Sequence, residues 1–148
     1  MLKFLNRIIQ SKDLSYSKLN QGVAARILCA IISDFDNVEK FQDQGLFMVK
    51  LLINESMKGN TKVISDYIIL VCFSHLLLIP KIINYFLQFD GLTALRSILE
   101  LNFKDLQITF YVFICYWILS YDEAFKKYAI DPKVILLEFN NSPTSGGP

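Results

Sequence analysis

The sequence predicts an all-α fold in which helical units stack into an α-solenoid of about three repeats, each of roughly 43 residues. First, Cys29, Cys72 and Cys115 lie 43 residues apart, each inside a strongly apolar segment. Second, each of these segments is followed by a turn pair, "QG", "DG" or "DP". Third, apolar residues recur at helical spacing after the turns. A period of about 20 to 50 residues is typical of solenoids.

The first element is a short helix, expected from about Leu2 to Gln10. Its sequence alternates charged and apolar residues at helical spacing. A secretory signal would instead need a long uninterrupted apolar region and a small-residue cleavage site. The polar connection "SKDLSYSKLN" then leads into the first repeat.

The three copies follow one order of elements. They read "VAARILCAIISDFDNVEKFQDQGLFMVKLLINES", "DYIILVCFSHLLLIPKIINYFLQFDGLTALRSILELN" and "TFYVFICYWILSYDEAFKKYAIDPKVILLEFN". In each, a long apolar helix carries the cysteine, and a polar or proline-bearing corner follows. A short segment and a turn then lead into a final amphipathic helix.

Residues at the turns favour the start of this final helix. Gly45 and Gly91 are expected to supply a backbone conformation that a side chain would disfavour, and Asp131-Pro132 forms an N-cap followed by proline at the first helical position. The apolar stripes behind the two glycines have identical offsets: Leu46, Val49, Leu52 and Ile53, then Leu92, Leu95, Ile98 and Leu99.

The most apolar stretch is the uncharged run from Leu106 to Tyr121. It has 16 residues, fewer than the roughly 20 of a membrane-spanning helix, so we expect a core helix that packs between neighbours on more than one side. The residues expected to fill the space between repeats are Phe110, Tyr111, Phe113, Ile114, Trp117 and Ile118, with Leu119 also in the core. Behind this helix, Asp122 with Lys126 and Glu123 with Lys127 are expected to form ion pairs on an exposed face.

Composition and sequence motifs argue against a catalytic, cofactor or metal site in this chain. The net charge is +1, so no strong field draws it to nucleic acid or anionic lipid. Phosphate-binding loops, dinucleotide fingerprints and zinc-protease motifs are absent. The cysteines are too far apart in sequence for typical zinc ligands, Asp34 and Asp36 are explained by a solvated corner, and the single histidine, His75, lies in an apolar segment. We expect no catalytic, cofactor or metal site and no small-molecule substrate.

The predicted domain organisation is a helical repeat domain over residues 1–139 and a disordered tail over residues 140–148. The tail "NNSPTSGGP" concentrates turn formers and small polar residues. Hydrophobic residues make up 53% of the chain, so a small membrane protein stays open as one hypothesis. Recovery of the protein in the soluble fraction without detergent would exclude it.

Two stretches resemble the N-terminal armadillo/HEAT-like domain of the H subunit of the vacuolar-type (V-type) proton-pumping ATPase. They are "GVAARILCAII" and "FDGLTALRSILELNFKDLQITFYVFICYWILSYDEAFKKY". The matching positions are Ala25-Arg26-Ile27, Asp90-Gly91-Leu92, Leu106-Gln107, Trp117-Ile118-Leu119 and Tyr121, within a resemblance over about residues 12 to 139. We expect Arg26 to be one of the core and turn residues. Tyr121-Asp122-Glu123 departs from the family's "F-x-P". The resemblance implies a right-handed α-solenoid of armadillo/HEAT-like repeats.

The resemblance also implies a function. Members of the family are non-catalytic regulatory and linking components whose N-terminal domain holds the peripheral stalk, on the cytosolic face of vacuolar and other endomembranes. The family's C-terminal domain has no counterpart here, so we expect a fragment or short version that binds without inhibiting. Residues that contact the partner are not assigned. The alternative is a generic armadillo/HEAT adaptor that grips a peptide or helix, although such adaptors repeat Trp and Asn, and Trp117 is the only tryptophan.

Overall fold

The computed structural model describes residues 2–10, 18–34 and 40–130, and every regular element in those ranges is helical. The all-α prediction is confirmed. In chain order the elements are α1 (Leu2–Gln10), α2 (Lys18–Ser33), α3 (Gln42–Ser56), the 3-10 helix η1 (Gly59–Thr61), α4 (Asp66–Leu76), α5 (Pro80–Gln88), α6 (Gly91–Leu101), α7 (Leu106–Leu119) and α8 (Glu123–Ile130). Among the described residues, no helix has the length and apolar character that a membrane crossing needs. The predicted helix after Asp131-Pro132, the predicted tail and Asp36 lie outside these ranges.

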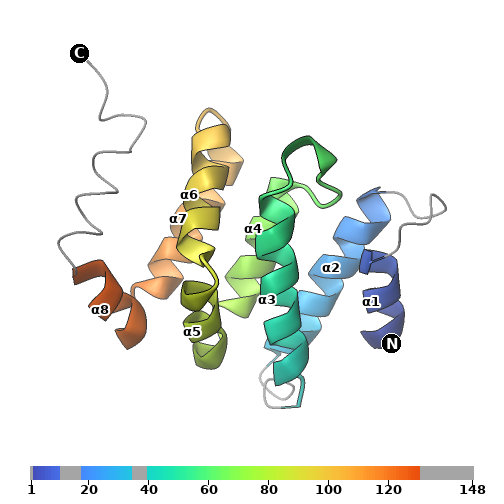
Figure 1. Ribbon diagram of the computed structural model, residues 1–148, viewed down its shortest axis with the longest axis horizontal. Coiled ribbons are helices and arrows are strands. Elements are labelled where there is room, and N and C mark those ends of the chain that lie inside the picture. The colour runs from blue at the N-terminus through green and yellow to red at the C-terminus, as the bar shows by residue number, and fades with distance from the viewer. Residues whose placement is uncertain (1, 11–17, 35–39, 131–148) are drawn as a thin grey trace.

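The three cysteine-bearing helices form one row. α2 packs against α4, and α4 packs against α7. Figure 1 shows α3, α5 and α6 as a second layer in front of this row, with α1 beside α2 at one end and α8 at the other. The apolar core lies between the two layers and between neighbouring helices of the row.

The cysteine side chains lie along this row and are fully buried. The thiols of Cys29 and Cys72 are neighbours across the α2–α4 contact. Cys115 donates a weak hydrogen bond of 3.8 Å from its Sγ to the carbonyl oxygen of Leu70, across the α4–α7 contact. The 43-residue spacing therefore reflects the packing of the helices, because residues at equivalent positions of successive helices lie next to one another.

Side-chain caps set where α4 and α7 begin. Ser65 precedes α4, and its Oγ accepts a hydrogen bond from the backbone N–H of Ile68 at 3.4 Å. Asp105 precedes α7, and its Oδ1 accepts from the N–H groups of Gln107 at 3.0 Å and Ile108 at 3.2 Å. Each cap satisfies N–H groups that have no partner inside the helix.

The start of α8 corrects a predicted ion pair. Asp122 does not pair with Lys126; its Oδ1 caps α8 by accepting from the N–H of Ala124 at 2.9 Å. Lys126 instead contacts Glu123 at 3.2 Å, which replaces the predicted pair between Glu123 and Lys127. A carboxylate next to free N–H groups at a helix start gains more from capping than from an exposed ion pair.

Gly45 and Gly91 are required at their positions for a different reason from the predicted one. Neither Gly45 nor Gly91 has a positive φ, and the left-handed residue is Asp90, with φ 64°. Both glycines instead allow close packing: a Cβ on Gly45 would lie 2.5 Å from the Cδ1 of Ile82, and one on Gly91 would lie 2.5 Å from the carbonyl oxygen of Phe86. Gly91 begins α6 as predicted, whereas Gly45 is the fourth residue of α3.

Candidate protein-binding surface

Groups that could carry chemistry are dispersed or buried. Among the described residues, no three His, Cys, Asp or Glu side chains are grouped so that they could hold a metal ion. Burial raises the pKa of the Cys115 thiol to about 12. Burial, together with the hydrogen bond and charge of Cys72, raises the pKa of the Cys29 thiol well above its usual value. A thiol nucleophile needs the thiolate form, so neither of these two groups is suited to catalysis near neutral pH.

His75 lies on α4 with its imidazole partly buried. Burial lowers its pKa, and the positive charge of Arg26 on α2 lowers the pKa further. Arg26 itself is exposed, although the sequence placed it among the core and turn residues. The histidine thus lies near the contact between α2 and α4.

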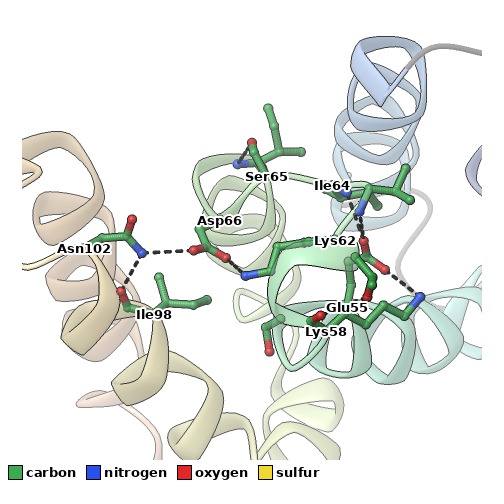
Figure 2. A network of polar contacts seen from close by, with 12 residues as sticks. Glu55, Lys58, Lys62, Ile64, Ser65, Asp66, Ile98 and Asn102 are labelled. Carbon is green, nitrogen blue, oxygen red and sulfur yellow. Dashed lines mark hydrogen bonds and ion pairs between the residues drawn. The ribbon is translucent and has the colours of Figure 1, made fainter.

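A network of polar contacts lies at the corner between α3 and α4 (Figure 2). Glu55 is only 4% exposed. Its Oε1 accepts from the backbone N–H groups of Val63 and of Ile64, the latter at 3.0 Å, and its Oε2 contacts Lys58 at 2.9 Å. Burial acts to raise the pKa of Glu55, but the hydrogen bonds from Ile64, Lys58 and Val63 outweigh it, so the pKa lies below its usual value.

The same network continues to α6. Asp66 pairs with Lys62 and accepts a hydrogen bond from the Nδ2 of Asn102 at 2.9 Å. Asn102 also donates to the carbonyl oxygen of Ile98 at 2.8 Å, near the end of α6 (Figure 2). These contacts join α3, α4 and α6, and their role is to hold the three helices together.

An exposed apolar surface runs along α7. Five large side chains, each between 59% and 83% exposed, recur every three or four residues and so share one side of the helix and its C-terminal end. We call this set the α7 outer face: Leu106, Phe110, Phe113, Trp117 and Tyr121. The prediction that Phe110, Phe113 and Trp117 fill the space between repeats is wrong.

α7 has two apolar stripes, and only one of them is buried. Ile108, Val112, Cys115 and Leu119 form the buried stripe, on the opposite side from the α7 outer face. In α4 the five consecutive residues 69–73 are all buried, because α4 lies between α2 and α7. The packing on two sides that was predicted for Leu106–Tyr121 is found for α4 instead. In the described part of the chain α7 ends the row, and its second stripe stays exposed.

A groove adjoins the C-terminal end of the α7 outer face. Its volume is about 380 Å³. It is lined by Leu77, Leu78, Pro80 and Ile83 around the α4–α5 connection and by Trp117, Ile118, Tyr121 and Asp122 at the end of α7. Trp117 and Tyr121 belong to both features, so the groove extends the exposed apolar surface. Large contiguous apolar surfaces rimmed by polar residues are typical of protein-binding sites.

The residues singled out in the sequence fall into two groups. Those buried in the core or at close helix contacts are Cys29, Cys72, Cys115, Leu119, Gly45 and Gly91, whereas Arg26 and Trp117 are exposed. No residue of the α7 outer face was assigned to binding from the sequence. The available signal was the position of the uncharged run in the last of the three copies, with no further aligned copy to cover it.

The described residues form an all-helical domain with one long exposed apolar helix face, an architecture that is suited to binding other proteins. Residues 1–140 match the family model that describes the H subunit of the V-ATPase. The chain therefore belongs to the V-ATPase H-subunit family, in its N-terminal domain, as the sequence resemblance indicates. Searches of curated proteins and of solved structures found no match.

Proposed function

We propose that this chain is a non-catalytic regulatory and linking subunit of the vacuolar-type proton-pumping ATPase that binds the peripheral stalk. The observation that carries the proposal is the family match over residues 1–140. The α7 outer face supports it, because a row of exposed apolar side chains along one helix is suited to holding another protein. The proposed location is peripheral, on the cytosolic face of vacuolar and other endomembranes.

The proposed architecture behind this function is a right-handed solenoid of about three armadillo/HEAT-like repeats. The row formed by α2, α4 and α7 supports it, since each helix of the row carries one of the equally spaced cysteines. Stacked helical units present an extended surface whose reach serves binding. Such a scaffold positions other subunits within an assembly, and other subunits of the pump carry out catalysis.

Direct binding to purified stalk subunits tests the proposal. The full chain, carrying an affinity tag, is mixed with the recombinant peripheral-stalk subunits, and a complex is sought by size-exclusion chromatography and titration calorimetry. We expect a stable complex with the stalk subunits and none with an unrelated coiled-coil protein of similar length. Failure to bind the stalk, combined with retention of import cargo or cytoskeletal proteins, would favour the adaptor alternative and overturn the proposal.

A further inference from the structure

The exposed side chains of the α7 outer face are arranged almost symmetrically along the helix. Leu106 and Phe110 lie seven and three residues before Phe113, and Trp117 and Tyr121 lie four and eight residues after it. When two identical helices pack antiparallel about a twofold axis, residues that face each other lie at equal distances on either side of the axis. An axis beside Phe113 would therefore bring Leu106 opposite Tyr121, and Phe110 opposite Trp117.

The two ends of the α7 outer face are complementary in shape. Leu106, at the N-terminal end, is the most exposed of the five side chains, at 83%. The C-terminal end has the groove of about 380 Å³, which Trp117 and Tyr121 line together with Leu78 and its neighbours. An antiparallel second copy would place its Leu106 at this groove, and the twofold axis would repeat the contact at the other end. Each copy thus supplies both the inserted side chain and the groove.

Charged residues beyond the two ends match in the same arrangement. Lys104 lies nine residues before Phe113 and Glu123 lies ten residues after it. Both are exposed, and the antiparallel pairing brings Lys104 of one copy near Glu123 of the other. Asp105 and Asp122 meet in the same way, but each accepts hydrogen bonds from N–H groups at a helix start, which offset its negative charge. Charge complementarity therefore favours this pairing at both ends.

The exposed area is sufficient for a weak dimer. An aromatic side chain buries about 150–250 Å², and the four aromatic residues of the face are each between 59% and 69% exposed. With Leu106 they offer on the order of 600 Å² per copy, so a pair that covers the face would bury roughly 1,200 Å². A specific interface needs about 1,000 Å². The net charge of +1 adds little repulsion between two copies.

We propose that the α7 outer face is a dimerisation surface, on which a second copy of this chain packs its own α7 antiparallel about a twofold axis near Phe113. The association requires this chain alone and does not depend on the proposed function. We expect a dissociation constant of about 10–100 μM, in keeping with an interface of this size. Below about 1 μM the chain would then be a single copy with the face exposed.

Two other occupants match the face less well. A lipid surface would accept aromatic side chains, but the acidic residues at the ends of the face, Asp105, Asp122 and Glu123, disfavour anionic headgroups. A further helical repeat unit would cover the apolar side chains. It would also have to supply a side chain for the groove and charges opposite Lys104 and Glu123, which a second copy already has in the required places.

Sedimentation velocity of the full chain between about 1 and 500 μM tests the association. We expect the weight-average mass to rise from that of one chain toward that of two. Trp117 is the only tryptophan and is 60% exposed. Its fluorescence emission should shift to shorter wavelength over the same concentration range, because the second copy removes the indole from water.

Matched variants test the surface. Phe113→Asp places a charge from each copy beside the axis, and we expect it to weaken self-association at least about tenfold. Phe47→Asp is the control: Phe47 is 40% exposed on α3, in the other layer, and we expect a dissociation constant within about twofold of that of the parent chain. Circular dichroism and the unfolding midpoint verify that both variants are folded.

Charge reversal tests the antiparallel arrangement. Lys104→Glu and Glu123→Lys should each weaken self-association about three- to tenfold, because each homodimer then contains two like-charged pairs. Mixed together, the two variants should associate about as tightly as the parent chain, since both pairs again have opposite charges. The doubly reversed chain should also recover its affinity. Lys104 and Glu123 lie at opposite ends of α7, so this recovery requires contact between two copies.

Each outcome decides the inference. Dimerisation that follows the expected variant pattern supports it. A chain that stays monomeric up to about 500 μM overturns it, and slow acrylamide quenching of Trp117 in that monomer identifies the chain's own segment as the cover. A dimer that tolerates Phe113→Asp, or that charge reversal leaves unchanged, also overturns it. Stalk binding by the parent chain is a separate measurement, so each of these results leaves the proposed function standing.

Discussion

The thiol of Cys115 in α7 donates a hydrogen bond of 3.8 Å to the carbonyl oxygen of Leu70 in α4, 45 residues earlier in the chain. A weak sulfur donor of this kind contributes little energy. Its importance is geometric, because a small side chain at this position lets the two helices approach closely. With the Cys29–Cys72 contact it explains why the cysteines recur with the repeat although they are free thiols.

The buried cysteines predict slow thiol chemistry in the folded protein. All three are fully buried, and burial raises the pKa of Cys29 and of Cys115. With Ellman's reagent at pH 8 we expect fewer than one reactive thiol per native chain and all three in denaturant. The variant Cys115→Ala should release one fewer in denaturant. Rapid reaction of the native protein would contradict the buried row.

Three glycines predict a graded series of alanine substitutions. Gly91→Ala should destabilise by about 1–3 kcal/mol, because the new Cβ meets the backbone oxygen of Phe86. Gly45→Ala should cost less, since it meets the end of the flexible Ile82 side chain. Gly22→Ala, where the nearest side-chain atom is at 3.6 Å, should stabilise by about 0.5–1 kcal/mol. Urea unfolding measures all three, and equal costs would contradict the close contacts.

Glu55 predicts a loss of stability in acid. Its folded-state pKa lies below the usual value near 4.5, so its contribution is present above about pH 4.5 and is lost as the pH falls through the folded pKa. Glu55→Gln should destabilise by about 1–2 kcal/mol at pH 7, and the difference from the parent chain should shrink below pH 4.5. Unfolding by urea at a series of pH values provides the measurement. A constant difference down to pH 3 would contradict the role of the charged form.

His75 predicts a second pH effect, with the sign set by its environment. Burial and Arg26 lower its pKa below the usual 6.5, so protonation opposes folding and stability declines as the pH falls below about 6.5. Since His75 is the only histidine, its NMR titration is unambiguous in the full chain. Arg26→Gln should raise the measured pKa only partway toward 6.5, because burial is the larger cause. A pKa at or above 6.5 in the parent chain would contradict the partly buried position.

Adjacent residues on α7 predict opposite responses to alanine. Val112 is fully buried and Phe113 is 61% exposed. Val112→Ala should cost about 2 kcal/mol through lost packing, whereas Phe113→Ala should change the free energy of unfolding by less than about 0.5 kcal/mol. Thermal and urea unfolding of the isolated chain compare the two. A larger cost at Phe113 would show that the outer face is covered.

Much of the fold follows from local patterns. The first helix has the predicted bounds, and the apolar spacing behind Gly91 predicts the buried residues Leu92, Leu95 and Ile98 of α6. Regular spacing of the cysteines predicts that they occupy equivalent, buried positions in their helices. These features depend on backbone propensity and on the period of apolar residues, both of which are written in neighbouring positions of the chain.

The sequence by itself determined that the chain is helical, where the cysteines lie and which family it belongs to. Tertiary structure decided which apolar surface is buried. α4 and α7 are both apolar around their circumference, yet α4 has a neighbour on each side in the row and α7 has one. Periodicity tells how much surface a helix offers for burial, whereas the number of neighbours tells how much is buried. Leu70 and Phe113 occupy equivalent positions of two repeats. Because α4 and α7 differ in their number of neighbours, Leu70 is buried in the core and Phe113 is exposed.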